Sequence, residues 1–473
     1  MPKLPKINLS KKNKIILAGI GGLLLVTMVI LFMVSRGQDG SSQPTVTLEY
    51  WGVFDDERVM GEIIDQYREI MPHVQINYTQ KDFATYEDDL RNALAGGNPP
   101  DIFSLSNGLV SKFRYSIAPL PETETGLIEE YFDVVEQDVV IDEQIYGLPY
   151  SVDSLALFYN KDLLEKAGIS NPPRTWDEFN DAIQSLTVLN PTGGFLQSGV
   201  ALGGSKKSVN RATDILGFFM MQQGTTITDR ETERVILLED SESLLGERVG
   251  EPGRKGLEEY LSYSQPTESV YSWNEDQYYS FDRFAQEKCA MMLSYAYSIA
   301  TVRENNPRMK FGVVPAPQPK NATKKIAYAN YWVETVPLET ENYKEAWEFI
   351  AWATSKDTVK LYSSLTNKPV SRRDLVNEQL NDADLGAFAE QNIYAESWYQ
   401  YDPTEVEMIL DTMLQEILSG VKDTETALTE ASTKIQALLD EGRRVKSIFQ
   451  EREEIELKEQ ELKDKEAKSK AAK

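Results

Sequence analysis

The sequence predicts an α/β fold preceded by one transmembrane helix, and three observations lead to this prediction. Strand-like and helix-like segments alternate over residues 46–105, and a second alternating set follows residue 153. Twenty consecutive uncharged, mainly apolar residues precede both sets. The chain has 473 residues, of which 41% are hydrophobic, so it can bury more than one core and should form two or three domains.

The apolar run at residues 15–34 is long enough to cross a bilayer, because a helix of this length spans about 30 Å. Five lysines precede it and Arg36 follows, so the positive-inside rule places the N-terminus in the cytoplasm and the remaining chain outside. The run is longer than a secretory h-region, and the best cleavage motif contains Arg36. We therefore expect an uncleaved signal anchor in a single-pass cell-membrane protein, with conventional secretion as the alternative.

The first segment after the anchor should alternate strands with helices. Strands are expected at residues 46–51, 74–78 and 102–105, and helices at residues 55–71 and 83–95. This order implies an open, mostly parallel sheet. Ligands of such sheets bind beyond the carboxyl ends of the strands, at the topological switch point. That rule selects the loops at residues 51–55 and 104–107.

The most specific local signals lie in residues 146–179. A strand at residues 152–159 is broken early by Asp153. A helix follows, with Asn160 as its N-cap and Gly168 as its left-handed C-cap. Thr175 and Glu178 then form a capping box that opens another helix.

Strand-like and helix-like segments alternate along the rest of the chain. Strands are expected at residues 199–202, 289–294, 311–317 and 326–333. Helices are expected at residues 209–222, 276–286, 343–354 and 424–439. Residues 229–253 carry weak signals and should form a surface excursion.

Several of these motifs closely resemble the family 1 extracellular solute-binding proteins, the maltose-binding-protein-like receptors of ABC importers. The resemblance covers roughly residues 44–440 and rests on residues 146–179, 284–297 and 311–317. It implies a two-lobed periplasmic-binding-protein-like fold with three crossings between lobes, near residues 150–153, at the return strand 311–317 and at 366–370. Three crossing strands form a hinge that permits lobe closure. Glu287 departs from the family pattern, which usually has glycine there.

The expected organisation follows from the anchor and the resemblance. We expect a cytoplasmic basic arm at 1–14, a transmembrane signal anchor at 15–34, a linker at 35–44, an N-lobe from 45–152 and 307–366, a C-lobe from 153–306 and 367–440, and a charged C-terminal helix or tail at 441–473. The tail lacks a sustained heptad, so a coiled coil is weakly supported. A solvated helix with ion pairs, or a partly disordered tail, fits better.

Composition excludes several functions. The formal charge is −26, and the portion after residue 36 carries 43 basic and 75 acidic residues, a net charge of −32. Such a surface repels nucleic acid and anionic lipid. Cys289 is the one cysteine and His73 the one histidine, which argues against a disulfide framework, a His-ligated metal and Ser-His or Cys-His catalysis. We expect no catalytic residue, metal site or cofactor.

Binding of a sugar or polyol needs aromatic faces for the C–H side of the ring, and carboxylates or amides for the hydroxyls. The topology selects Trp51 and Asp55, although Trp51 could be a core residue and Asp55 a helix-terminus acid. Asp153 lies inside an apolar strand, where a carboxylate is costly unless it is bonded. The expected ligand-binding residues are Trp51, Asp55, Phe83, Ser106, Asn107, Asp153, Gly204, Ser205, Tyr295, Tyr297, Trp332, Trp398 and Tyr401. The resemblance implies ligand contacts for Asn107, Asp153, Tyr297 and Trp398 in particular.

The resemblance implies an extracellular receptor that captures a small neutral polar ligand by lobe closure and delivers it to an ABC permease. The apolar run at residues 15–34 adds the membrane anchor, and we expect a monomer. A sugar or oligosaccharide is the expected ligand. Polyamines or peptides are alternatives, because aromatic and acidic groups also suit cations. A sensory binding module is a further alternative. Sequence alone also leaves a carboxylate-pair hydrolase open, because acids occur throughout the chain.

Overall fold

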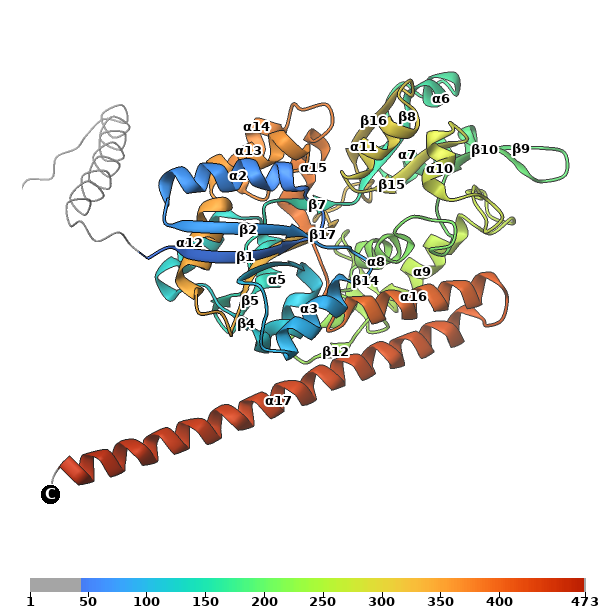
Figure 1. Cartoon of the computed structure of the whole chain (residues 1–473). Helices are drawn as coiled ribbons and strands as arrows, with labels where there is room; N and C mark the ends of the chain where they lie inside the picture. The colour runs from blue at the N-terminus through green and yellow to red at the C-terminus, as the bar shows by residue number, and fades with distance from the viewer. Residues whose placement is uncertain (1–43, 472–473) are drawn as a thin grey trace, which may run out of the picture. The chain divides into compact units, whose positions relative to one another are not determined.

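The computed structural model describes residues 44–471, so the expected anchor at residues 15–34 lies outside the described part of the chain. No helix within residues 44–471 is both long enough and apolar enough to span a bilayer. Two β-sheets, each with its own helices, form two lobes in this part of the chain (Figure 1). The two α/β lobes expected from the sequence are therefore present.

A seven-stranded sheet forms the first lobe, with the order β18-β17-β3-β1-β2 and with β4 and β7 also paired to β17. Its strands are β1 (Val46–Gly52), β2 (Val74–Gln80), β3 (Ile102–Ser106), β4 (Ile117–Ala118), β7 (Val152–Ser154), β17 (Ala327–Pro337) and β18 (Ala395–Glu396). Strands β1 and β3 are parallel, but β17 runs antiparallel to β3. The sheet is mixed, and not mostly parallel as expected, because β17 returns directly from the other lobe without a crossover helix.

Helices cover this sheet. They are α2 (Glu57–Ile70), α3 (Tyr86–Ala95), α4 (Val110–Phe113), α5 (Asp133–Val139), α12 (Tyr343–Ala353), α13 (Lys356–Thr366) and α14 (Val376–Gln379), with the 3-10 turns η1 (Asn107–Leu109), η2 (Arg114–Ser116), η3 (Glu122–Glu130) and η4 (Arg373–Leu375), and the small hairpin β5 (Val140–Ile141) and β6 (Gln144–Ile145). Helix α2 begins after Asp56, whose carboxylate accepts from the Val59 N–H at 2.8 Å. Helix α3 begins later than residue 83, because Asp82 accepts from the Ala84 N–H and holds a turn there.

The second lobe has a five-stranded sheet with the order β16-β8-β15-β10-β9. Its strands are β8 (Ala156–Asn160), β9 (Val188–Leu189), β10 (Phe195–Val200), β15 (Cys289–Ser294) and β16 (Phe311–Pro315). We expected β16 to be the return strand of the first lobe, but it pairs with β8 over five residues. The chain therefore leaves the second lobe after Pro315. Strand β10 begins at Phe195, four residues before the expected start.

Helices of the second lobe are α6 (Lys161–Lys166), α7 (Trp176–Leu186), α8 (Ala212–Gln222), α9 (Pro252–Ser262), α10 (Ser280–Ala285), α11 (Ser298–Asn305), α15 (Gly386–Gln391), α16 (Pro403–Leu418) and α17 (Thr424–Ala471). The 3-10 turn η5 (Asn392–Tyr394) lies against β7 and β17 of the first sheet. The caps expected at Asn160 and Thr175 are present, and Thr175 forms a complete capping box with Glu178. The weak stretch after residue 228 forms two short hairpins, β11 (Thr228–Asp229) with β12 (Arg234–Val235) and β13 (Ser241–Glu242) with β14 (Arg248–Val249).

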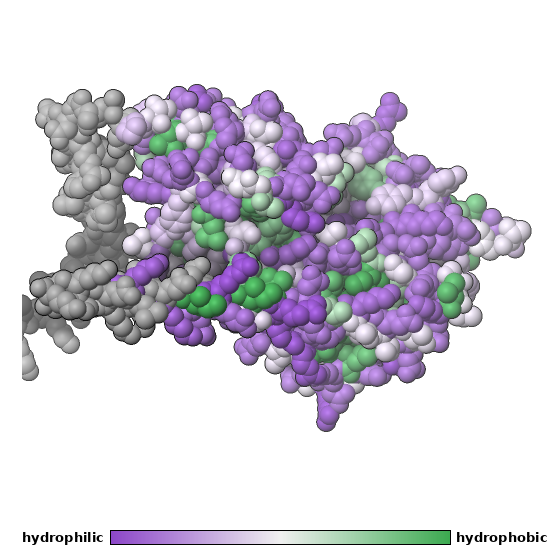
Figure 2. Space-filling model, turned by 60° about the horizontal axis from the view of Figure 1, so that its bottom comes forward, coloured by the Kyte–Doolittle hydropathy of each residue, from purple (hydrophilic) through white to green (hydrophobic). Residues whose placement is uncertain are grey.

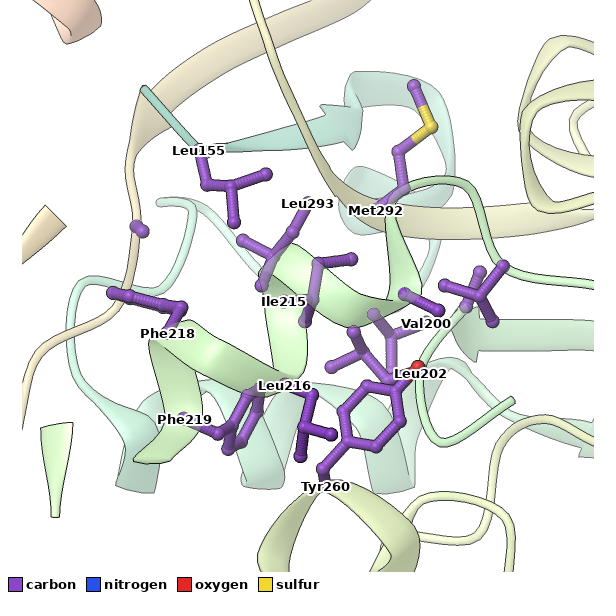
Figure 3. Close-up of a cluster of buried hydrophobic side chains, with 14 of the residues drawn as sticks. Leu155, Val200, Leu202, Ile215, Leu216, Phe218, Phe219, Tyr260, Met292 and Leu293 are labelled. Carbon is purple, nitrogen blue, oxygen red and sulfur yellow. The ribbon is translucent and has the colours of Figure 1, made fainter. Parts of the chain in front are cut away.

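The core of the second lobe is centred on α8, every residue of which is buried. Figure 3 shows Ile215 and Leu216 of this helix among side chains from neighbouring elements, including Tyr260 and Leu293. A helix that is apolar on all sides belongs in the centre of a lobe. Its position brings the first turn of α8 to the edge of the second sheet that faces the first lobe, where the candidate site lies.

Two of the three expected crossings lie close to their predicted positions. Strand β7 pairs with β17 in the first sheet and β8 pairs with β15 in the second, so the chain crosses at Leu155. It crosses back between β16 and β17. The crossing expected at residues 366–370 is not there, because Val370 packs with Val359 and Leu375 in the first lobe. The third passage comes between Leu375 and α15, because Leu385 and Phe388 are buried in the second-lobe core. The chain then returns to the first sheet at β18 and leads into α16, which packs on α8.

Helix α17 extends the chain well beyond the expected terminal helix at 424–439. It continues as a single helix of 48 residues, so the helical alternative for the charged extension is the one that the structure has. Figure 1 shows α17 running along both lobes and projecting past them. The face in Figure 2 is predominantly hydrophilic, and its hydrophobic residues form small separate groups, as expected for such an acidic chain.

Candidate functional site

A cavity of about 980 Å³ lies between the two lobes. Residues that follow β1 and β3 form one wall, and residues at the start of α8 and after β15 form the other. This is the position that the topological rule selects, beyond the carboxyl ends of strands. The volume is at the upper end of the range of about 300–1,000 Å³ that is usual for small-molecule sites.

Strand β17 supplies the cavity with a row of four side chains. Tyr328, Asn330, Trp332 and Glu334 alternate along the strand, and all four line the cavity. Side chains two residues apart share one face of a strand, so their common direction follows from the pleat. At about 3.3 Å per residue the row is about 20 Å long. The cavity is therefore long enough for an extended ligand.

Aromatic rings gather around Trp332. The ring of Phe54 lies 5.1 Å from Trp332, that of Tyr86 5.9 Å and that of Phe83 6.4 Å, measured between centroids. Phe54 and Phe83 are 53% and 63% exposed although both line the cavity. Large exposed rings are unfavourable in water unless a ligand or partner covers them. This aromatic group offers apolar faces to a ligand.

The wall from the second lobe carries a fixed ion pair. Arg211 precedes α8 in the left-handed conformation, with φ 57°, and its guanidinium lies 2.6 Å from the Asp214 carboxylate. The Tyr295 hydroxyl donates to the same carboxylate at 2.6 Å. Asn330 of the first sheet reaches it at 3.4 Å, so the group links the two lobes. Tyr297, 48% exposed, extends the wall.

Asp153 also connects the lobes. It lies in β7 of the first sheet, and its carboxylate accepts from the backbone N–H of Ala296, which follows β15 of the second, at 2.9 and 3.1 Å. The N–H of Ser154 donates to it at 2.8 Å. Burial raises the pKa of Asp153 to about 7, although these N–H groups oppose the shift. The carboxyl group therefore changes protonation near neutral pH.

Glu334 forms the buried end of the β17 row. Its carboxyl group accepts from the Ser104 hydroxyl at 2.9 and 3.0 Å. Burial raises the pKa of Glu334 to about 8, and the nearby Asp55 charge adds to this shift. At neutral pH most of this group is protonated, so it can donate a hydrogen bond as well as accept one.

Asp55 is paired with a residue that sequence reasoning missed. Lys368 lies 2.6 Å from the Asp55 carboxylate, and the Tyr362 hydroxyl donates to it at 2.8 Å. The helix-capping role falls to Asp56, which leaves Asp55 directed at the cavity. Lys368 lies within the segment predicted as the third crossing, residues 366–370, and that position was the available signal.

Acids outnumber bases in the cavity lining, nine to four. All four bases have a carboxylate partner, and they are Arg91, Lys112, Arg211 and Lys368. No basic group of the lining is therefore left to neutralise an anionic ligand. Within residues 44–471 no cluster of three or more His, Cys, Asp or Glu side chains is arranged to hold a metal ion.

Eight of the thirteen sequence-predicted residues line this cavity. They are Asp55, Phe83, Ser106, Asp153, Tyr295, Tyr297, Trp332 and Trp398. The sequence missed other lining residues, among them Phe54, Arg211, Asp214, Tyr328, Glu334 and Lys368. The two-residue period around Trp332 could have identified Tyr328 and Glu334. Arg211 and Asp214 gave no comparable signal, because a pair three residues apart does not indicate a cavity, and the other partners of Asp214, Tyr295 and Asn330, are far along the chain.

The remaining five predicted residues lie outside the lining, each with another partner. Lys81 lies over the Trp51 ring at 4.1 Å, and the Asn107 amide donates to the buried Asp138 at 2.8 Å. Ser205 donates to Glu275 through its backbone N–H and its hydroxyl, and the Gly204 carbonyl accepts from Tyr260. Tyr401 lies against Gly442 of α17, where an added Cβ would meet its ring at 2.6 Å.

Comparison with known proteins identifies relatives along most of the described chain. The sequence model of a family described as bacterial extracellular solute-binding protein matches residues 55–360. A Brucella abortus protein named as a binding protein is 27% identical over 313 residues, which are 63% of this chain and 69% of that one. The arabinooligosaccharide-binding protein of Bacillus subtilis is 24% identical over 364 residues, 74% of this chain and 78% of that one.

Solved structures share the fold. The sugar-binding protein MalE of Xanthomonas citri superimposes with a TM-score of 0.69 at 18% identity, over 85% of this chain and 99% of that one. An ABC transporter solute-binding protein of Thermotoga lettingae, bound with alpha-D-tagatose, gives a TM-score of 0.65 at 23% identity, over 84% of this chain and 100% of that one. These matches confirm the predicted two-lobed α/β fold.

Proposed function

This chain belongs to the bacterial extracellular solute-binding proteins, and we propose that it captures a sugar or oligosaccharide between its lobes and delivers it to an ABC permease. The family consists of binding proteins, so the chain is not an enzyme, as its sequence predicted. Relatives named for arabinooligosaccharide and maltodextrin binding support a carbohydrate ligand. The proposal applies their ligand class to this chain, and the cavity chemistry supports it.

The aromatic group at Trp332 is the observation that carries the proposal. Its rings line a cavity that also holds an amide at Asn330 and carboxyl groups at Asp153 and Glu334. A sugar presents an apolar C–H face and directed hydroxyls, which match rings and fixed polar groups respectively. The row along β17 is long enough for several linked rings. An oligosaccharide uses the whole row, whereas a monosaccharide would leave part of it empty.

Charge favours a ligand without negative groups. The lining holds more acids than bases, and each base is already paired with an acid. A carboxylate or phosphate ligand would have to displace one of these pairs. The same acidic excess favours a polyamine as the second candidate, because a cation would gain from both the acids and the aromatic faces.

Lobe closure is the proposed mechanism. Asp153 and Asp214 each accept hydrogen bonds from the opposite lobe beside the cavity. A ligand that contacts both walls adds binding free energy only when the lobes are together, so it shifts the population toward the closed form. The closed, loaded form is the one that a permease would recognise.

A thermal-shift screen followed by small-angle scattering tests this function. The full chain is screened with arabinotriose, maltotriose, tagatose and spermidine. We expect a saccharide to raise the melting temperature and to reduce the radius of gyration. If spermidine raises the melting temperature and none of the saccharides does, the polyamine alternative is favoured. A stabilising compound that leaves the radius of gyration unchanged would contradict closure.

A further inference from the structure

The charged C-terminal extension contacts both lobes. The first part of α17 belongs to the second lobe, where Leu428 and Ile435 are buried in its core, and Leu439 is also buried. Beyond Leu439 the helix continues to Phe449, whose ring stacks on Tyr115 with centroids 4.2 Å apart and parallel planes. Tyr115 lies in η2, directly before β4 of the first sheet. The extension therefore spans from one lobe to the other outside the cavity.

The extension is fixed to the second lobe by more than its core residues. The Arg443 guanidinium donates to the Glu233 carbonyl at 2.8 Å and contacts the Glu233 carboxylate at 3.2 Å. Gly442 lies against the Tyr401 ring, with no space for a larger residue. Ten residues separate Leu439 from Phe449, a helical length of about 15 Å. The continuous helix therefore links the second lobe to Tyr115 of the first.

A second contact between the lobes lies beside the first. Lys112 of α4, three residues before Tyr115, pairs with Asp402 at the N-cap of α16 at 2.6 Å. The Thr404 hydroxyl donates to Glu87 of α3 at 3.1 Å. The first-lobe segment at residues 110–116 is thus contacted by both C-terminal helices of the second lobe, α16 and α17. If one lobe rotated relative to the other, these contacts and the Phe449–Tyr115 stack would break at the same time.

We propose that residues 441–452 of α17 act as a brace that stabilises the closed arrangement of the lobes by stacking Phe449 on Tyr115. The inference rests on the proposed lobe closure, and it concerns contacts that no ligand makes. A contact present only in the closed form shifts the equilibrium toward that form before ligand arrives. Both rings are half-buried, and an aromatic pair of this kind changes such an equilibrium by roughly two- to tenfold.

Distances between spin labels on the two lobes measure this equilibrium directly in the full-length chain. Labels are placed at E69C on α2 and Q184C on α7, which are exposed positions on different lobes. Native Cys289 is buried, and burial raises its pKa to about 12, so it should not take the label. The parent chain, which lacks both introduced cysteines, is treated with the label in parallel to check that Cys289 stays unlabelled.

We expect Phe449→Ala to lower the ratio of short to long interlobe distances roughly two- to tenfold without ligand. Phe449→Tyr should restore the ratio. Ile448→Ala, at the adjacent position that is 50% exposed, should leave the ratio as in the parent. Adding Tyr115→Ala to Phe449→Ala should change little, because the stack is already lost.

A distance distribution in Phe449→Ala that equals the parent distribution overturns the brace. An equal effect of Ile448→Ala overturns the stacking contact as its cause. Failure of the proposed function has a different signature. In that case the parent distances stay the same after addition of each compound from the thermal-shift screen.

Discussion

Glu334 is a carboxyl group buried inside the first lobe, with Ser104 donating a hydrogen bond to it. Its neighbours include the acid Asp55, whose charge disfavours ionisation of Glu334. Burial and this charge together raise its pKa from 4.5 to about 8. The folded protein therefore holds a proton that the unfolded chain releases between these two pH values.

Glu334 should make stability fall as pH rises. Its contribution is fully present below about pH 4.5 and is lost as pH rises through about 8, because the folded state binds the proton more tightly. Glu334→Gln removes this dependence. The free energy of unfolding of the variant minus that of the parent should therefore grow as the pH is raised from 5 to 8. Urea denaturation across this range measures the difference. The exposed-site variant Glu69→Gln should track the parent, and a pH-independent difference for Glu334→Gln would contradict the assignment.

Asp153 shows how far a single residue can be interpreted from sequence. An acid within an apolar strand predicted a bonded or ligand-contacting carboxylate. The structure places Asp153 in the cavity lining and gives it a backbone partner, Ala296, in the opposite lobe. No local pattern could have identified that partner, because the two residues are 143 positions apart.

Strand β17 is the element on which the candidate site depends most. Replacing its central ring by Trp332→Ala would remove the residue on which Phe54, Phe83 and Tyr86 converge. For the saccharide found by thermal shift, we expect binding to weaken about tenfold or more, since stacking and buried apolar area are both lost. Isothermal titration calorimetry measures the change.

Trp51→Ala is the matched control for this prediction. Trp51 was expected to contact ligand from the sequence, yet it lies outside the cavity lining under Lys81. Its removal should leave the dissociation constant within about twofold of the parent value, because no cavity contact is lost. Equal weakening by both variants would indicate a general effect on the first sheet.

Elements with strong local signals were predictable, and those defined by distant pairing were not. Caps at Asn160 and Thr175 follow from hydrogen bonds within four residues, so their positions could be predicted from sequence. The lobe to which β16 belongs depends on its pairing with β8, about 150 residues earlier, and local sequence does not specify that choice. The same applies to Lys368, whose partner Asp55 is 313 residues away.

At the scale of the whole molecule, we propose that the apolar run at residues 15–34 anchors the protein with its lobes outside the cell. The full-length chain should then stay in the membrane pellet after carbonate extraction, and protease added to intact cells should digest it. Deletion of residues 2–36 should release the protein from the membrane fraction. A shortened product in the culture medium would instead support conventional secretion.

Interleaving of the two lobes has a consequence for synthesis. Ser104 and Glu334 are hydrogen-bonded neighbours in the first sheet, yet 230 residues separate them. At a typical ribosomal rate, roughly 10 to 50 seconds pass between their appearance. Until then β3 has an open edge, which can pair with another nascent chain. The first lobe, although its chain is translated first, thus stays incomplete until most of the chain has been made.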